Sequence, residues 1–201
     1  MKTKNLISMM FGCLAALCVT SCLGDDNNNN SSSTLSKSQI AQCFMTVKGD
    51  YTGDLLYLAK ADDGLTEQVD TLVGEWSIPT DSTLIIYDFP AKVLAEFVSH
   101  TGLKKALAEA PNQDVKCQTR YVNVSPVQFL VNPRTLEYDL FYDGSTHKVH
   151  VVFFGENTYS FASFDAESND MMVKIIPAYL YVDEKMTSYL TQSQIIFLGK
   201  R

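Results

Sequence analysis

Three histidines are the first side chains to consider for acid–base chemistry or metal binding. His147 and His150 lie three residues apart in a segment that alternates like a β-strand, so their side chains should point to opposite faces and cannot bind one metal ion together. His100 follows a predicted helix, where a protonated imidazole would interact favourably with the helix dipole. We therefore expect structural or surface roles for all three histidines, and no metal site.

Carboxylates are numerous, but their spacing gives little support for catalysis. The loop 165–170 (DAESND) places oxygen ligands at alternate positions, as a calcium site would. It lacks the spacing and the central glycine of an EF-hand, so a solvated loop is the simpler interpretation. The sequence contains no G-x-S-x-G, no C-x-x-C, no H-E-x-x-H and no phosphate-binding glycine loop. It therefore predicts no catalytic residue, no enzyme activity and no cofactor.

Cys22 has the clearest chemical signature, because the sequence before it has the form of a bacterial lipoprotein signal. Lys2 and Lys4 form a basic start, residues 6–19 form an apolar run, and Ser21 is the small residue expected before a lipidated cysteine. The run is shorter than the ~20 residues that a transmembrane helix needs, so it predicts a removable export signal. We expect cleavage before Cys22 and acyl chains on its thiol and amine, which would anchor the protein without spanning the membrane. The alternative is an ordinary signal peptide in which Cys22 is incidental.

The segment after Cys22 is polar and acidic. Residues 23–34 read LGDDNNNNSSST and cannot bury enough apolar area to offset the cost of ordering, so we expect a flexible tether. The acidic pair and polar tract resemble the export signals of Bacteroidetes surface lipoproteins. We predict an outer-membrane, lipid-anchored protein on the cell surface, with a periplasm-facing lipoprotein as the alternative. The predicted organisation is a signal peptide at 1–21, the lipidated cysteine and tether at 22–35, and one domain at 36–201.

The charge of the chain excludes some partners. Without Lys2 and Lys4, 14 of the 16 basic residues remain against 23 acidic residues, so the processed chain would carry a net charge near −9. Such a charge argues against binding to nucleic acid and against electrostatic adhesion to anionic lipid. We therefore expect contact with the membrane through the lipid anchor.

Two further cysteines lie in the predicted domain. Export would place Cys43 and Cys117 in an oxidising compartment, where a disulfide between them is permitted. Cys43 also fits the apolar face of a predicted helix, so a buried free thiol is the alternative. The sequence cannot supply the Cα separation that a bridge requires, and both arrangements stay open at this point.

Two short motifs resemble the acceptor sites for O-linked glycans in exported proteins of Bacteroidetes. They are Asp70-Thr71-Leu72 and Asp81-Ser82-Thr83. The resemblance implies that Thr71 and Ser82 are sites of O-glycosylation.

The elements that would position these residues are mostly strands. Ser36 or Ser38 can cap a short helix that runs to about Val47, and Gly49 would end it. Period-two patterns then predict strands at 55–58, 67–73, 83–87, 115–124, 127–131, 136–142, 147–154, 158–164, 171–182 and 193–198. Turns are predicted at Asp62-Asp63-Gly64 and at Asp143-Gly144.

One stretch breaks this alternation. Apolar residues at helical spacing in 93–98 and 103–110, opened by Pro90, predict two helices inserted between the early and late strands. We therefore predict an α+β fold that is predominantly antiparallel β, with a curved or barrel-like sheet, a short N-terminal helix and an inserted helical hairpin.

Aromatic residues offer another type of binding surface. Tyr138, Tyr142, Tyr179 and Tyr181 recur at every second position of strands, so they should lie in rows. Such rows can stack sugar rings or line an apolar pocket, but they can equally be sheet-packing residues with hydrated hydroxyls. Trp76, the single tryptophan, is expected in the core or at its rim.

Two stretches carry a family resemblance. The residues 49–53 (GDYTG), which open a strand, and 86–90 (IYDFP), which precede an amphipathic helix, resemble a family of Bacteroidetes lipoproteins of unknown function. The resemblance covers most of 36–198 and implies no catalytic residue. The opening strand is also similar to that of lipocalin-like barrels.

Three classes of function fit these features. The first is a surface-anchored binding or accessory module for a glycan, a peptide or an outer-membrane protein, and it is the one we expect. The second is a lipocalin-like carrier of a small apolar ligand, which requires a closed barrel with a hollow interior. The third is a hydrolase whose site is assembled only in the folded chain, which would show convergent titratable groups.

Overall fold

A computed structural model of the protein describes residues 34–60, 66–155 and 159–201. The architecture below is that of the compact unit 34–201. Cys22 and the predicted turn at 62–64 lie outside the described residues.

The domain begins with helix α2 (Lys37–Val47). The Ser36 hydroxyl accepts a hydrogen bond from the Gln39 backbone N–H, and the Gln39 side chain accepts one from the Ser36 N–H at 2.8 Å. This reciprocal pair satisfies two N–H groups that the first turn leaves without partners. Gly49 follows at φ +134°, a conformation that glycine adopts without steric cost. The predicted helix, its cap and its end are confirmed.

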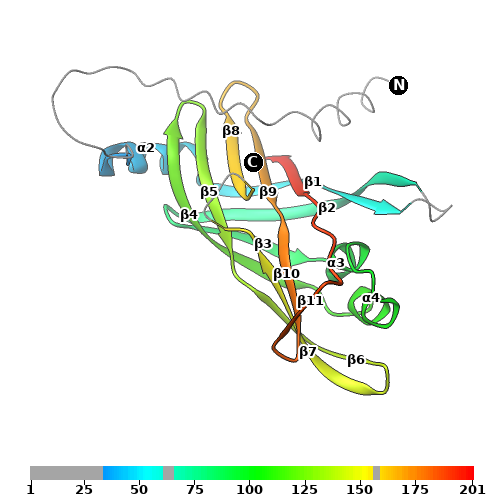
Figure 1. The fold of residues 1–201 in the computed structure, drawn as a ribbon. Coiled ribbons are helices and arrows are strands. Elements are labelled where there is room, and N and C mark those ends of the chain that lie inside the picture. Colours follow the sequence, from blue (N-terminus) through cyan, green and yellow to red (C-terminus); the bar gives the residue numbers. More distant parts are fainter. Residues whose placement is uncertain (1–33, 61–65, 156–158) are drawn as a thin grey trace. The chain divides into compact units, whose positions relative to one another are not determined.

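Eight antiparallel strands close into a barrel (Figure 1). In chain order they are β1 (Gly49–Lys60), β2 (Glu67–Thr80), β3 (Thr83–Phe89), β4 (Gln113–Val124), β5 (Val127–Pro133), β8 (Phe161–Asp165), β9 (Asp170–Ile175) and β12 (Ile195–Lys200). Each strand pairs with the next one in this series, and β12 pairs with β1 to close it. The barrel is therefore of the up-and-down type, in which closure leaves no free edge to the sheet as a whole.

Two hairpins inserted into this series form a second sheet. β6 (Leu136–Tyr142) and β7 (Ser145–Phe153) follow β5, while β10 (Pro177–Val182) and β11 (Lys185–Thr187) follow β9. The four strands lie in the order β11-β10-β7-β6. Burial alternates strictly along β6, which confirms the face predicted for residues 136–142.

One predicted strand is in fact two. The segment 171–182 was expected to be continuous, but it divides at Ile176 into β9, which belongs to the barrel, and β10, which belongs to the second sheet. Pro177 has no N–H to donate to a strand ladder, and the register between β10 and β7 shifts between Pro177 and Tyr179. The chain changes sheets at this point.

Helices α3 (Ala91–Glu96) and α4 (Thr101–Ala108) form the inserted hairpin that the sequence predicts. Their apolar positions are buried, including Val93, Leu94, Leu103 and Leu107. No helix of the described residues is long and apolar enough to cross a membrane.

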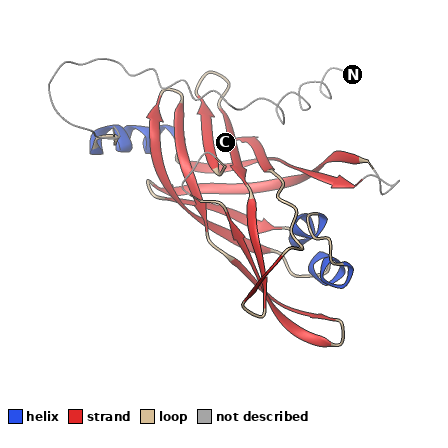
Figure 2. Cartoon of the chain, viewed as in Figure 1, coloured by secondary structure: helices blue, strands red, loops and turns tan. Residues whose placement is uncertain are grey.

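Strands dominate the described domain, as Figure 2 shows. The predicted predominance of antiparallel β and the barrel-like sheet are therefore confirmed, and the α+β class is refined to a mostly antiparallel β fold, a closed eight-stranded barrel with few helices. The helices are short: α3 and α4 pack against each other, α4 also packs against β6, and α2 packs against β4 and β5.

The side chains that point into the barrel form one apolar core. Trp76 is 0% exposed and its ring stacks on Tyr51 with centroids 5.7 Å apart, so it belongs to this core. Other core residues with 2% exposure or less are Leu55, Ile78, Leu84, Ile86, Phe129, Val131, Phe164, Val173 and Phe197. If a void large enough for water lay beside these side chains, part of their surface would be accessible to solvent. The barrel is therefore filled at these residues, as side chains fill small eight-stranded barrels.

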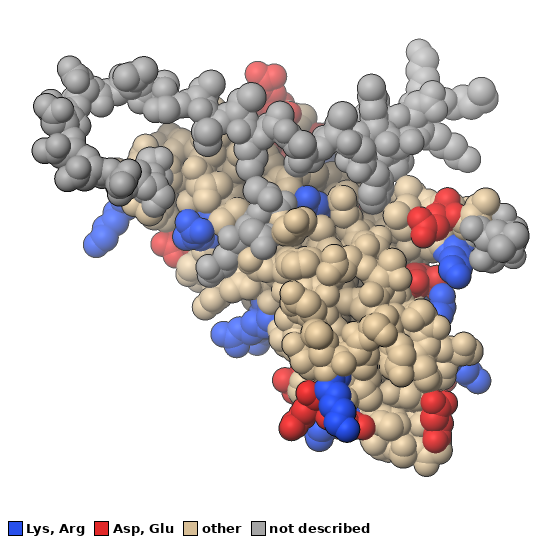
Figure 3. Space-filling view, viewed as in Figure 1, with Lys and Arg blue, Asp and Glu red and all other residues tan. Residues whose placement is uncertain are grey.

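Charged residues are distributed unevenly over the surface. On the face in Figure 3, acidic and basic side chains gather together at the end of the domain that holds β6 and β7, and a broad neutral area lies beside them. Lys148 and Asp139 form one of the ion pairs on these strands, at 3.4 Å. Charges of opposite sign largely offset each other at this end.

Candidate anion-binding groove

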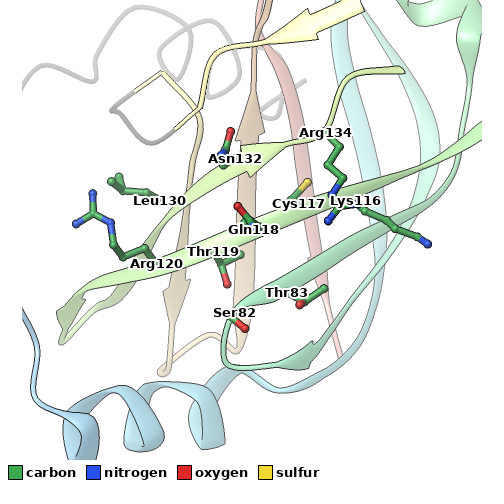
Figure 4. A pocket seen from close by; sticks show the side chains of 10 residues that line it. All are labelled: Ser82, Thr83, Lys116, Cys117, Gln118, Thr119, Arg120, Leu130, Asn132 and Arg134. Carbon is green, nitrogen blue, oxygen red and sulfur yellow. The ribbon is translucent and has the colours of Figure 1, made fainter. Parts of the chain in front are cut away.

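A groove with a volume of about 600 Å³ lies over β3, β4 and β5 on the outside of the barrel (Figure 4). We call it the outer groove. It is lined by Ser82, Thr83, Lys116, Cys117, Gln118, Thr119, Arg120, Leu130, Asn132 and Arg134. Its volume is within the range of about 300–1,000 Å³ that is typical of small-ligand sites.

Strand β4 supplies the middle of the outer groove. Its odd-numbered positions from Val115 to Tyr121 point toward the core, whereas Lys116, Gln118 and Arg120 are exposed. This period of two follows from the pleat of a strand and places the three polar side chains on one face.

The strand register arranges the groove residues in rows across the sheet. The central row is neutral and polar: Thr83 on β3 lies opposite Gln118 on β4, and Gln118 lies opposite Asn132 on β5. A hydroxyl and two amides therefore lie side by side, and each can donate as well as accept hydrogen bonds.

Cations lie on both sides of this central row. On one side, Lys116 is next to Arg134, whose backbone N–H donates to the Lys116 carbonyl at 2.9 Å. On the other side, Arg120 lies opposite Leu130. Figure 4 shows Arg120 at one end of the outer groove and Lys116 and Arg134 at the other. At ~3.3 Å per residue, the Cα atoms of Lys116 and Arg120 are about 13 Å apart.

The three cations of the outer groove form no ion pair with a carboxylate of the described residues. The residues that line the groove include no Asp or Glu. Within the described part of the chain, the ion pairs involve His100, Lys104, His147, Lys148 and Lys200, and none involves the groove cations. In a chain with a net charge of −7, the groove is thus a local concentration of positive charge.

This set of side chains is suited to binding rather than to bond cleavage. A guanidinium group can donate two parallel hydrogen bonds to a carboxylate or a sulfate, and an ammonium group adds a point charge. The amides and hydroxyls between them can bind the hydroxyl groups of a ligand. The groove lining contains no histidine and no carboxylate, the side chains that most often serve as general bases.

Gly155 lies against the groove residue Asn132. A Cβ atom added at Gly155 would overlap the side-chain oxygen of Asn132. The backbone after β7 therefore approaches the central row more closely than any other residue type would allow.

The residues predicted for modification are placed as follows. Ser82 is exposed in the turn between β2 and β3 and lines the outer groove, whereas Thr71 is exposed on β2 and does not line it. Both hydroxyls are accessible, as O-glycosylation requires. Cys22, the predicted lipidation site, lies outside the described residues.

The two cysteines of the domain are free and buried. The Cys43 thiol lies 3.7 Å from the carbonyl oxygen of Asn123 on β4. Cys117 is on the same strand, and the chain advances about 20 Å from Cys117 to Asn123 at ~3.3 Å per residue. A disulfide needs Cα atoms within about 7 Å of each other, so of the two arrangements left open by the sequence, the structure has the two separate thiols.

The loop 165–170 does not gather ligands for calcium. Asp165 accepts a hydrogen bond from the Glu167 backbone N–H at 2.9 Å, and this bond is the main reason why the pKa of Asp165 is lowered. Asp170 pairs instead with Lys200 at 3.3 Å. Among the residues that the structure describes, no group of three or more histidine, cysteine or carboxylate side chains could hold a metal ion.

The histidines differ in part from expectation. His147 and His150 belong to one strand, at positions that face opposite ways, as predicted. His100 begins a helix rather than stabilising the end of one, because its Nδ1 accepts a hydrogen bond from the Leu103 N–H of α4 at 3.2 Å. His100 does follow α3, as predicted, but its side-chain contact is with the first turn of α4.

Two of the four tyrosines predicted to lie in rows are sheet-packing residues. Tyr138 and Tyr142 are buried, whereas Tyr179 is 45% exposed on the opposite face of the second sheet. The four tyrosines therefore do not form one continuous platform.

Sequence analysis did not identify the outer groove. Lys116 and Arg120 could have been noticed as cations at alternate positions of a predicted strand. Their relation to Asn132 and Arg134 depends on the register between β4 and β5, which the sequence does not state.

The groove is part of a family domain. The model of a domain of unknown function, DUF4840, matches residues 46–182. The chain belongs to the DUF4840 family. The DUF4840 match runs from the end of α2 to the end of β10 and includes every residue of the outer groove, while β11 and β12 lie beyond it. The match confirms the predicted assignment to a family of unknown function. No curated protein and no solved structure matches the chain.

Proposed function

We propose that this DUF4840 protein is a lipid-anchored binding module of the cell envelope that holds an acidic saccharide in the outer groove. The observation that carries the proposal is the set of three unpaired cations around a row of amide and hydroxyl groups, in a domain that is otherwise acidic. Anchoring at Cys22 would keep this site at a membrane surface, exposed to polymers outside the cell.

The geometry of the groove favours an elongated ligand over a single small anion. Positive charges lie on both sides of the central row, about 13 Å apart along β4. A chain of sugars with more than one carboxylate or sulfate could contact Arg120 at one end and Lys116 or Arg134 at the other. The sugar hydroxyls between these groups would then meet Gln118 and Asn132.

Two other functions receive less support. A carrier of a small apolar ligand needs a hollow barrel, and the inward side chains of this barrel are buried against one another. An acidic peptide would also satisfy the cations, but it brings few hydroxyl groups for the neutral row. Binding of such a peptide in place of a saccharide is an outcome of the test below.

The anchor and the groove are tested separately. For the anchor, cells are grown with labelled palmitate, and we expect label on the wild-type protein and none on Cys22→Ala, which should leave the membrane fraction. Absence of label from the wild type would contradict the anchor and would leave the groove untouched.

For the groove, the purified protein is titrated by calorimetry with oligogalacturonate, sulfated oligosaccharides, a neutral maltooligosaccharide and an oligoglutamate peptide. We expect binding of an acidic saccharide that weakens as salt is raised, because mobile ions screen exposed charges. Lys116→Glu/Arg120→Glu should lower the affinity at least tenfold, about 1.4 kcal/mol or more. Lys92→Glu/Lys105→Glu is the matched control, because both lysines are exposed on the helical hairpin and the change in charge is identical. Equal losses in both variants, or tighter binding of the peptide, would contradict the proposal.

A further inference from the structure

A serine, a histidine and an aspartate form a chain of hydrogen bonds in the second sheet. The Ser145 Oγ lies 2.8 Å from the Nε2 of His147, and the Nδ1 of His147 lies 2.7 Å from the Oδ2 of Asp183. Ser145 and His147 are on β7, and Asp183 is in the turn between β10 and β11, so the three residues come from the two inserted hairpins (Figure 1).

The fold fixes all three side chains. Ser145 and His147 are two residues apart on one strand and therefore point to the same face. Asp183 has φ +49° in its turn, a conformation that aspartate tolerates better than most residues. Its Oδ1 accepts a hydrogen bond from the Lys148 N–H at 3.0 Å, and its own N–H donates to the Lys148 carbonyl at 2.9 Å.

The hydrogen-bond partners determine where the protons are. The hydrogen bond from His147 is the main reason why the pKa of Asp183 is lowered, so this carboxylate is charged at neutral pH. An ionised carboxylate can only accept, so the Nδ1 of a neutral His147 carries the proton. The Nε2 then presents its lone pair to the Ser145 hydroxyl, which donates to it. This is the arrangement in which a histidine can remove a proton from a serine.

The imidazole is held in place while the serine stays accessible. The ring of buried Tyr142 packs against the ring of His147 with centroids 4.4 Å apart. The His147 side chain is 22% exposed, and Ser145 is exposed at the start of β7. A reagent from solution can therefore reach the Ser145 hydroxyl without rearrangement of the sheet.

We infer that Ser145 is a nucleophile activated by His147, with Asp183 as the positioning residue, and that this site transfers acyl groups from carboxylic esters to water. The Ser145 oxygen bonds to the ester carbonyl carbon as its proton passes to the Nε2 of His147. The bond to the leaving alkoxide breaks, and the alkoxide takes that proton. A water molecule then attacks the acyl carbon while the Nε2 of His147 takes its proton. The bond between that carbon and the Ser145 oxygen breaks, and His147 returns the proton to this oxygen, which restores Ser145.

Charges of both signs surround the site. Asp143 lies in the turn just before Ser145 and contacts His100 at 3.5 Å, and Glu184 follows Asp183 directly. Lys148 and Lys185 lie beside Asp183 as well, so these charges offset each other and we assign no preference for the charge of the ester. The site is separate from the outer groove, whose lining includes none of these residues.

The test uses a fluorophosphonate probe on the purified protein. Labelling forms a bond from the Ser145 oxygen to phosphorus and expels fluoride, while the serine proton passes to His147. Peptide mapping by mass spectrometry should place the label on Ser145. Ser145→Ala should abolish it, and His147→Gln should slow it at least about 100-fold, as expected for loss of a general base.

The variant Asp183→Asn distinguishes a role of Asp183 in positioning His147 from a purely structural role. Asparagine tolerates the same backbone conformation and can still accept the Lys148 N–H, so the protein should keep its fold, with a melting temperature that at neutral pH is somewhat below that of the wild type. The labelling rate should nevertheless fall at least about tenfold, because the amide no longer fixes the proton on Nδ1. The inference is overturned if Ser145 is labelled no faster than another exposed serine, such as Ser82 or Ser168, in the wild-type protein. It is also overturned if Asp183→Asn labels at the wild-type rate.

Discussion

Lys116 and Arg120 lie on the same outward face of β4, on either side of Gln118, and no carboxylate of the described residues is within 4.0 Å of either cation. The chain has 23 acidic residues against 16 basic ones, so acidic partners are not scarce. None of the residues that line the outer groove is acidic, although Asp81 precedes Ser82 and Asp114 lies two positions before Lys116. The positive potential there is left for a ligand.

The contact between Gly155 and Asn132 predicts a mutation that alters the groove without changing its charge. In Gly155→Ala, the new methyl group would displace the Asn132 side chain from the central row. We expect a several-fold loss of affinity for an acidic saccharide, measured by calorimetry. In an Asn132→Ala background the same methyl group has no side-chain oxygen to meet, so Gly155→Ala should have little further effect. Fully additive losses would contradict this account of the contact.

The closure of the barrel depends on two glycines. Gly53 on β1 lies opposite Gly199 on β12, and a Cβ at Gly199 would lie 2.6 Å from the Trp76 ring and would also overlap the Thr52 carbonyl oxygen. Because one of these obstacles is backbone, Gly199→Ala should cost about 1–3 kcal/mol of unfolding free energy.

Urea denaturation followed by circular dichroism measures this cost. Lys200→Ala, at the next position of β12, is the control and should cost less than about 1 kcal/mol, since it removes an exposed ion pair. If both variants have the same unfolding midpoint as the wild type, the strands are not closely packed at this position.

Asp183 predicts a stability effect at acid pH. The hydrogen bonds from His147 and from the Lys148 N–H hold the pKa of Asp183 below its ordinary value of 3.8. The carboxylate thus stabilises the fold fully above the pKa of the unfolded chain, and this contribution is lost as the pH falls through the lower pKa of the folded state. The difference in melting temperature between wild type and Asp183→Asn should therefore shrink between pH 5 and pH 2. A constant difference over this range would show that the folded state does not depress this pKa.

The cysteines of the domain predict a simple chemical result. Burial raises the pKa of both the Cys43 and the Cys117 thiols, so both should react slowly with a thiol reagent in the native protein. Both should react at once in urea, without prior reduction. A mass increase of two hydrogens on treatment with a reductant would reveal a disulfide and contradict the separation of these residues.

Local features of the fold could be predicted from the sequence. The cap at Ser36, the alternation along residues 136–142 and the two apolar stripes around Gly102 each depend on neighbours within a few positions. The division of the segment 171–182 into two strands was missed, because it depends on which sheet accepts each half. Pro177 was the available signal.

The candidate sites depend on contacts that are distant in the sequence. His147 and Asp183 are 36 positions apart and meet because β10 pairs with β7. The spacing of His147 and His150 argues against a shared metal site, but nothing in the sequence pairs either residue with the turn after β10. The outer groove likewise depends on the register of β4 with β5, which side-chain packing in the core sets.

The location of the binding site is the most direct test of the proposed function. Amide chemical shifts of the isotope-labelled protein are recorded by NMR while an acidic oligosaccharide is added. The largest changes should map to residues 116–120 and 130–134, with smaller changes at Ser82 and Thr83. Changes that map to the exposed side of the second sheet around Tyr179, with none at the outer groove, would contradict the account.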